Sequence, residues 1–160
     1  MAPDKSPATE AFWQAYKRAT GAPERDYQVA AFGDMPDLRD ELAALAAAGT
    51  KRATAALRRD FDDETLPKVG DLVVLLDGSL TPVFIWRTTE ITIKPMNQVD
   101  AAFAWDEGEG ARTVESWLAD HRAYFADQAR HEGFQMHDDI ELVFERFKVV
   151  WPPELADPDR

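Results

Sequence analysis

A short motif with residues that could do chemistry begins at Gly49 and reads Gly-Thr-Lys-Arg-Ala-Thr. A glycine lets the backbone approach a ligand closely, and the N–H groups beside it can hold an anion. Lys51 supplies a positive charge and Thr54 supplies a hydroxyl group. The simpler interpretation is a helix end followed by solvated side chains. The spacing of a Walker A loop is absent, so this is not a nucleotide-binding P-loop.

A second motif places two carboxylates, Glu107 and Glu109, on either side of one glycine. Crowded carboxylates can take different pKa values and so divide acid and base roles between them. Their oxygens also allow a divalent cation at this loop. The plain alternative is an exposed loop that caps the following helix. No other metal site or cofactor is predicted, because His131 and His137 lie six residues apart without a carboxylate at a zinc-motif spacing.

Several aromatic residues and one histidine could complete a ligand site. His121, four residues after Trp117, could act as a general base or donate a hydrogen bond to a substrate. Such a pair is more often part of a core, and most of the five tryptophans are expected there. Trp86 or Trp105, each near a polar loop, could instead stack on a nucleobase.

The elements that must position these residues follow from hydrophobic periodicity and turn signals. Helices are predicted from Ser6-Pro7 to the stop signal at 21–23, from around 34–36 to Gly49, over 98–105 and from Thr113 to about 131. Strands are predicted over 52–58, 72–76, 81–93 and 140–150. Helices followed by strands, an inserted helix and a closing strand do not give a regular alternation of strand and helix. The order predicts an α+β fold with a mostly antiparallel sheet that could curl into a small barrel.

Composition narrows the classes of partner. The 160 residues are enough for one domain with a full core. They carry 18 basic and 30 acidic side chains, a formal charge of −12. This charge disfavours long duplex DNA and anionic membranes. The absence of cysteine, of an apolar membrane span and of a signal-peptide pattern at the N-terminus predicts a cytoplasmic protein. The charge is uneven, because 49–59 hold four basic and no acidic residues, whereas 98–120 hold six acidic and one basic.

An ordered series of short motifs resembles the ASCH domain family in its longer bacterial form. The resemblance spans 12–150 as a single domain, with an N-terminal tail and the start of the first helix over 1–11 and a flexible C-terminal tail over 151–160. The motifs that carry it are Trp13 and Tyr16, Phe32-Gly33-Asp34, Leu42, Leu45, 49–54, Pro67, Gly70-Asp71, Thr88-Thr89, Phe103-Ala104, 107–110, Trp117, His121, Phe125 and Phe144-Glu145-Arg146-Phe147.

The resemblance implies a PUA-like fold, which is a small, mostly antiparallel β-barrel with surrounding helices. It also implies a role in RNA metabolism: ribonuclease activity is described for longer bacterial members, and a shorter member deacetylates N4-acetylcytidine. Carried over by motif, the catalytic set is Lys51, Thr54 and either Glu107 or Glu109. Many long members have Asp where this chain has Ala111, so a role of that position in holding the loop is in doubt here.

Two functions from different classes are compatible with these residues, and a third possibility is a protein–protein module that merely retains the family cleft. The first is hydrolysis of RNA or of an acylated nucleoside, which requires Lys51 and Thr54 to cooperate although residues three apart on a regular strand face opposite sides. The second is binding of a nucleoside, nucleotide or short RNA without chemistry. No oligomeric state is predicted. The residues predicted to bind substrate are Gly49, Thr50, Arg52, Arg58, Trp86, Trp105, His121 and Tyr124.

Overall fold

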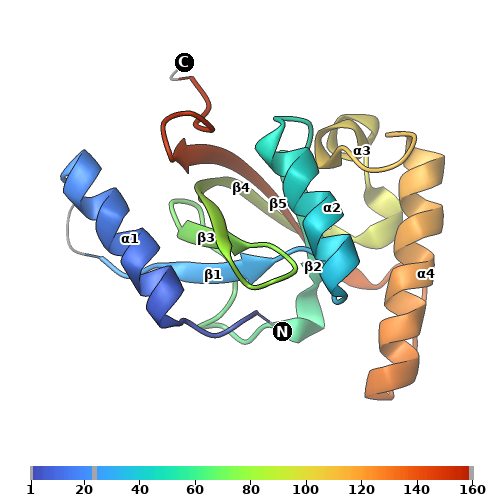
Figure 1. Ribbon diagram of the computed structural model, residues 1–160. Coiled ribbons are helices and arrows are strands. Elements are labelled where there is room, and N and C mark those ends of the chain that lie inside the picture. The colour runs from blue at the N-terminus through green and yellow to red at the C-terminus, as the bar shows by residue number, and fades with distance from the viewer. Residues whose placement is uncertain (1, 23–24, 159–160) are drawn as a thin grey trace.

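The computed structural model describes residues 2–22 and 25–158, which form one five-stranded sheet with helices packed around it (Figure 1). The order of the strands across the sheet is β1-β3-β4-β5-β2. The elements along the chain are α1 (Pro7–Thr20), β1 (Gln28–Ala31), α2 (Pro36–Ala47), β2 (Ala53–Leu57), η1 (Arg58–Asp60), β3 (Leu72–Leu76), β4 (Pro82–Pro95), η2 (Met96–Gln98), α3 (Ala101–Glu107), α4 (Val114–Glu132) and β5 (Glu141–Trp151).

The sheet is mixed and curled into a half-barrel. β1 pairs with β3 in parallel, whereas the β3–β4, β4–β5 and β5–β2 pairs are antiparallel. The register of β4 against β5 shifts between Ile85 and Trp86 and again between Thr88 and Glu90. Such bulges bend a strand and increase its twist, which explains how the long β4 can serve both halves of a curved sheet.

Local sequence signals explain where the helices start and stop. Ser6 forms a reciprocal capping box with Thr9 at the start of α1, and Gly21 in the left-handed region ends it. The side chain of Thr113 accepts a hydrogen bond from the N–H of Ser116, and this cap fixes the first turn of α4. The predicted positions of these helices are confirmed.

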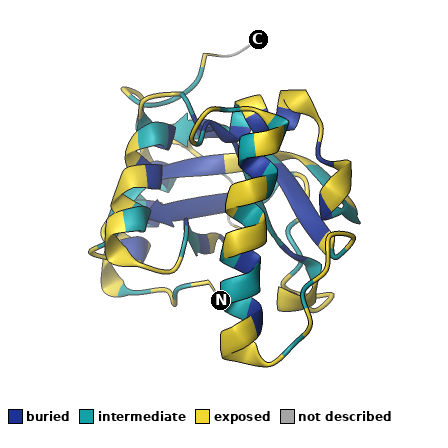
Figure 2. Cartoon of the chain, turned by 90° about the vertical axis from the view of Figure 1, so that its right-hand side faces the viewer, coloured by how far each residue is buried: buried dark blue, intermediate teal, exposed yellow. Residues whose placement is uncertain are grey.

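The sheet has apolar residues on both faces. α2 covers one face, where Leu42 and Ala46 pack with Trp86 and Phe147. On the opposite face α1 covers the β3 side, and α3 with α4 covers the β2 side. Figure 2 shows the result: the strands are largely buried between helices whose outward surfaces are exposed. The predicted α+β, PUA-like fold is confirmed.

Two features differ from the sequence-based expectations. β1 was not predicted, because the four residues Gln-Val-Ala-Ala are too short and too weakly apolar to show a periodicity. After β5, Leu155 packs against the core cluster under α2, and the backbone of Asp157 pairs with Val149. These two residues of the predicted flexible tail are therefore docked on the domain, whereas residues 159–160 lie outside the described residues.

Within the described part of the chain, no helix is both long and apolar enough to cross a membrane.

Candidate functional site

Lys51 is the centre of the most unusual polar cluster in the molecule. It lies between the end of α2 and the start of β2, and its side chain is only 1% exposed. The ammonium donates to the carbonyl of Ala53 at 2.8 Å, on the open edge of the sheet, and to Glu109 Oε2 at 2.8 Å. It also lies 3.5 Å from Glu107 Oε1 and 4.8 Å from the ring centroid of Phe32. The ammonium of this lysine therefore has two carboxylate neighbours in a nearly dry environment, where ion pairing offsets part of the cost of burial.

Glu107 is the buried anion of this cluster, at the last position of α3. One of its oxygens accepts a hydrogen bond from the indole Nε1–H of Trp117, and the other lies 3.2 Å from Nε2 of His121. Burial acts to raise the pKa of Glu107, but the positive charge of Lys51 and then that of His121 outweigh it and lower the pKa to about 2. Both oxygens are thus occupied, and Glu107 holds other groups in place as a permanent anion.

Glu109 differs from Glu107 because it reaches solvent. Its side chain is 26% exposed, and only Oε2 is tied to Lys51. Burial raises the pKa of Glu109; Lys51 opposes this, while the charge of Glu107 adds to it. A partly accessible carboxyl with a raised pKa can bind and release a proton at a higher pH than an ordinary carboxyl, which suits a general acid or base. The two glutamates, which the sequence could not distinguish, therefore differ in exposure and in the direction of their pKa shifts.

Gly108 brings these two glutamates against the lysine. It ends α3 with φ of +73°, and a Cβ atom built on it would lie 2.6 Å from the carbonyl oxygen of Thr50. Next to it the N–H of Arg52 donates to the carbonyl of Asp106 at 2.7 Å. Only glycine permits both this left-handed backbone and this approach, so the loop is docked onto the segment that carries Lys51.

His121 links the cluster to α4. Its ring stacks on Trp117 with centroids 3.8 Å apart, and Nδ1 lies 2.8 Å from the carbonyl of Trp117. Because a carbonyl only accepts, Nδ1 carries a proton, and Nε2 faces the Glu107 carboxylate. Burial lowers the pKa of His121, but the charge of Glu107 and its hydrogen bond outweigh burial and raise it. Trp117, which the sequence assigned to the core, thus also donates a hydrogen bond directly to the Glu107 carboxylate.

The same cluster contains ligand types that suit a divalent cation. One carboxylate oxygen each from Glu107 and Glu109 and a ring nitrogen of His121 all lie within 4.8 Å of one another. However, the ammonium of Lys51 contacts both carboxylates and already balances their charge. A cation would meet that ammonium at close range, so these residues fit a metal only if Lys51 moves away.

Thr54 lies apart from this network. It is on β2 directly opposite Glu145 of β5, and residues paired in this way share one face of the sheet. That face is the one covered by α2, and Phe32, whose ring centroid lies 4.8 Å from the Lys51 ammonium, belongs to the apolar cluster on the same face. Among the described residues, no hydrogen bond joins the Thr54 hydroxyl to Lys51 or to either loop glutamate.

The neighbouring backbone and arginines have structural partners. The N–H groups of Gly49, Thr50 and Lys51 donate to carbonyls of α2, so none of them is free for an anion. Arg52 forms a two-point ion pair with Asp157, at 2.9 and 2.8 Å, and donates to two backbone carbonyls. Arg58 donates to the carbonyl of Phe61 and lies 3.6 Å from Asp63.

The predicted aromatic contacts lie in different environments. Trp86 is 2% exposed and packs against Phe147 and Phe32, with ring centroids 4.4 and 5.7 Å away, so its ring is buried and not accessible to a base. Trp105 is 58% exposed, and the guanidinium of Arg112 lies 3.7 Å from its ring centroid. Tyr124 is half-buried on α4. Burial, and after it the charge of Asp34, raises the pKa of Tyr124 to about 12.

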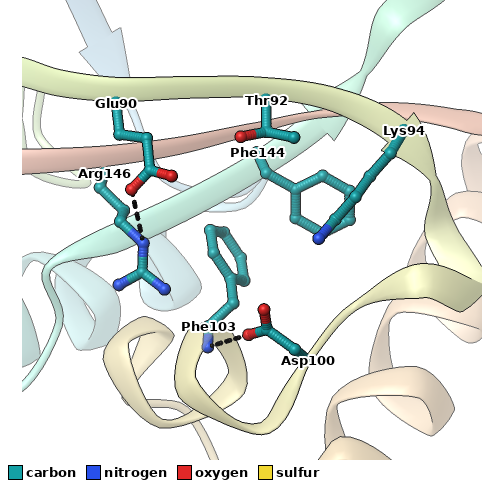
Figure 3. A pocket seen from close by; sticks show the side chains of 7 residues that line it. All are labelled: Glu90, Thr92, Lys94, Asp100, Phe103, Phe144 and Arg146. Atoms are coloured by element: carbon teal, nitrogen blue, oxygen red, sulfur yellow. Dashed lines mark hydrogen bonds and ion pairs between the residues drawn. The ribbon is translucent and has the colours of Figure 1, made fainter.

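Two hollows on the described surface can be compared as candidate ligand sites. The first, in Figure 3, is lined by β4, β5 and the start of α3, with Arg146 3.2 Å from Glu90, and measures only about 40 Å³. The second is open, measures about 390 Å³ and includes Arg52 and Asp157 in its wall. Sites for small molecules commonly measure about 300–1,000 Å³, so only the second hollow has a suitable volume.

A mixed, curled half-barrel sheet with helices around it defines the PUA-like class of fold. The family model for the ASCH domain matches residues 28–151, and the chain belongs to this family. The resemblance predicted from the motifs is confirmed.

Two crystal structures are similar to the chain over most of its length. A protein from Enterococcus faecalis V583, described under the family model DUF984, is 33% identical over 88% of this chain and 86% of its own, with a TM-score of 0.81. An ASCH domain from Lactobacillus crispatus JV V101 is 26% identical over 90% of this chain and 94% of its own, with a TM-score of 0.80. No curated protein in the comparison matches the sequence.

Proposed function

We propose that this protein hydrolyses a bond in a nucleoside, a nucleotide or a short RNA, with Lys51 and Glu109 as the reacting pair. The observation that carries this proposal is the buried ammonium of Lys51, 2.8 Å from a carboxyl that reaches solvent. PUA-like folds of the ASCH type are often linked to RNA binding, which agrees with this class of substrate.

The roles follow from the environment of each group. Lys51 supplies a fixed positive charge where an oxyanion develops, and burial strengthens its effect. Glu109 takes a proton from the attacking water and returns it to the leaving nitrogen of an N-acyl nucleoside. With RNA the same carboxyl would take the proton of the 2′-hydroxyl. Glu107 and His121 keep the lysine charged and positioned, and Thr54 offers a hydroxyl contact to the substrate.

Charge distribution supports a small substrate. The negative loop faces a short basic segment, and the formal charge of −12 repels a long polyanion. Arg52, which could otherwise bind a phosphate chain, is already paired with Asp157. These features favour a nucleoside or a few nucleotides over a continuous strand.

The test compares five purified proteins: wild type, Lys51→Met, Glu109→Gln and two matched controls, Lys68→Met and Glu115→Gln, at exposed positions. Each is incubated with N4-acetylcytidine and with RNA 15 to 20 nucleotides long, with magnesium or with EDTA, and products are separated by chromatography. We expect Lys51→Met and Glu109→Gln to lose at least about 100-fold in rate, and the controls to match wild type.

Two results would overturn the proposal. One is full activity in Glu109→Gln, which keeps the size of the side chain but removes its acid–base function. The other is no product from either substrate by the wild-type protein. If wild type then still binds a nucleoside, the second candidate, a PUA-type binding module without chemistry, replaces the hydrolase. Its binding constant for RNA should fall steeply with salt.

A further inference from the structure

Glu145 is a buried carboxyl that the site described above does not use. It lies on β5, is 7% exposed, and forms no ion pair with any cation among the described residues. Its Oε2 accepts hydrogen bonds from the hydroxyl of Thr88 at 2.7 Å and from the indole Nε1–H of Trp86 at 3.3 Å. Burying a carboxyl without a cation costs free energy, so its presence in the sheet calls for a physical reason.

The second oxygen of Glu145 is open. No described residue donates a hydrogen bond to Oε1. Yet every fully buried side-chain oxygen and nitrogen in the described chain has a hydrogen-bond partner. It follows that Oε1 reaches accessible space, although nine-tenths of the residue is covered. The carboxyl is therefore held by the hydrogen bonds to Oε2, whereas Oε1 can form a hydrogen bond with a bound ligand.

The open oxygen is next to a residue of the proposed site. Thr54 lies directly opposite Glu145 on the neighbouring strand, on the face of the sheet that α2 covers. Paired side chains on one face have Cβ atoms about 5 Å apart, which is within reach of one small polar group. Thr54 is also three residues from Lys51 along the chain.

The protonation state of Glu145 decides what it offers. Burial raises its pKa to about 7, against the hydrogen bonds from Thr88 and Trp86; the one charged group that contributes is Asp71, which raises the pKa further. Because Oε2 accepts two hydrogen bonds, the proton of the neutral acid resides on Oε1. The open atom is then a donor in the acid form and an acceptor in the ionised form.

We propose that Glu145 determines which nucleobase edge the site accepts, by donating to a ring nitrogen in its acid form and accepting from a ring N–H in its ionised form. The proposal rests on the nucleoside-directed function above. In the acid form it favours cytosine or adenine, whose acceptor ring nitrogen lies beside an amino group that can donate to Thr54. Uracil and guanine bring an N–H to the same place and are favoured only by the carboxylate.

Cytidine and uridine are the matched probes, because they differ at this edge and carry no phosphate that titrates in the same range. Binding is measured at pH 5.5 and pH 8.5 from the indole N–H resonance of Trp86, which reports on the group that bonds Glu145. Trp86→Phe assigns that resonance. We expect wild type to bind cytidine about 2- to 10-fold more tightly than uridine at pH 5.5, the worth of one hydrogen bond, and to lose or reverse this preference at pH 8.5.

Glu145→Gln separates this role from a structural one. Its carbonyl can take the bonds from Thr88 and Trp86, so its amide places a permanent donor where Oε1 was. We expect cytidine preference to persist and to become independent of pH. Glu145→Leu, if it folds, should lose the preference at both pH values, and Glu115→Gln should behave as wild type.

A wild-type preference that does not change with pH would overturn the inference, as would a pH response unchanged in Glu145→Gln, or no movement of the Trp86 resonance with either nucleoside. Turnover lost in Glu109→Gln, together with a wild-type nucleoside preference that is constant with pH, would overturn this inference and leave the proposed hydrolase standing. Binding with the expected preference but without turnover would overturn the proposed hydrolase and leave this inference standing.

Discussion

The ammonium of Lys51 lies 3.5 Å from the carboxylate of Glu107, and both side chains are almost completely buried. Neither charge is stable in that position without the other, because an isolated buried ion loses its hydration. This pair joins the segment between α2 and β2 to the end of α3, and through Trp117 and His121 it extends to α4. The positions of the other side chains of the site depend on this buried ion pair.

Glu107→Gln should destabilise the protein strongly. The change keeps the shape of the side chain but leaves the proton on His121 without its anion, and leaves Lys51 with the partly exposed Glu109 as its one carboxylate neighbour. We expect a loss of about 3–5 kcal/mol in the free energy of unfolding, measured by urea denaturation at pH 7. Glu115→Gln, at an exposed position of α4, should stay within about 0.5 kcal/mol of wild type. Equal stability of the two variants would show that the buried pair is not a structural requirement.

Glu145→Gln should change the dependence of stability on pH. A carboxyl with a folded-state pKa of about 7 and an ordinary value of 4.5 binds its proton more tightly in the folded chain. The stability this contributes is fully present below pH 4.5 and is lost as pH rises through 7. Relative to Glu145→Gln, wild type should lose about 3 kcal/mol between pH 4.5 and pH 8.5, measured by urea denaturation across this range. Parallel curves for the two proteins would contradict this prediction.

His121 should contribute in the same direction at a different site. Glu107 raises the pKa of His121, so the stability from its protonated form is present below the ordinary value of 6.5 and declines as pH rises through the raised value. His121→Asn removes this contribution. The difference in unfolding free energy between wild type and His121→Asn should therefore be larger at pH 6 than at pH 9. A difference that is constant with pH would mean that folding leaves the pKa of His121 unchanged.

Gly108→Ala tests whether the close approach to Thr50 holds the loop. Gly133 is the matched control, because its φ of +78° is similar but its Cβ would meet no atom within 4 Å. Gly133→Ala should cost about 1–2 kcal/mol through backbone strain alone. Gly108→Ala should cost that amount plus about 1–3 kcal/mol for the clash, and should lower the rate of any hydrolysis. Equal costs in thermal or urea unfolding would mean that the contact relaxes freely.

Arg52 and Asp157 offer a test of whether the tail is a structural part of the domain. Their two-point ion pair is partly buried, and Asp157 also accepts from the N–H of Val149. A double-mutant cycle with Arg52→Ala and Asp157→Ala should give a coupling energy of about 1 kcal/mol or more. A coupling near zero, with ligand binding lost in Arg52→Ala alone, would instead support the substrate-binding role predicted from sequence.

Local signals in the amino-acid sequence were sufficient for most of the elements. The cap at Ser6, the glycine at position 21 and the apolar run Leu72–Leu76 act within a few residues, so the helices and four of the five strands could be placed. β1 could not, because a four-residue strand is stabilised by its pairing with β3 and not by its own composition. The register of β4 also shifts near Thr88, which its own sequence does not signal, and Ile93 beyond the shift is 38% exposed.

The sequence by itself determined which chemical groups are available: a lysine and a threonine after α2, two glutamates around a glycine, and a histidine on an apolar helix. Only the tertiary structure decided how they are used. Lys51 and Glu107 are 56 residues apart, and their contact depends on Gly108 docking onto Thr50. Burial then made Glu107 a fixed anion, left Glu109 able to exchange a proton and raised the pKa of Glu145. Desolvation and the distance between charges depend on the folded environment, and no spacing along the chain encodes them.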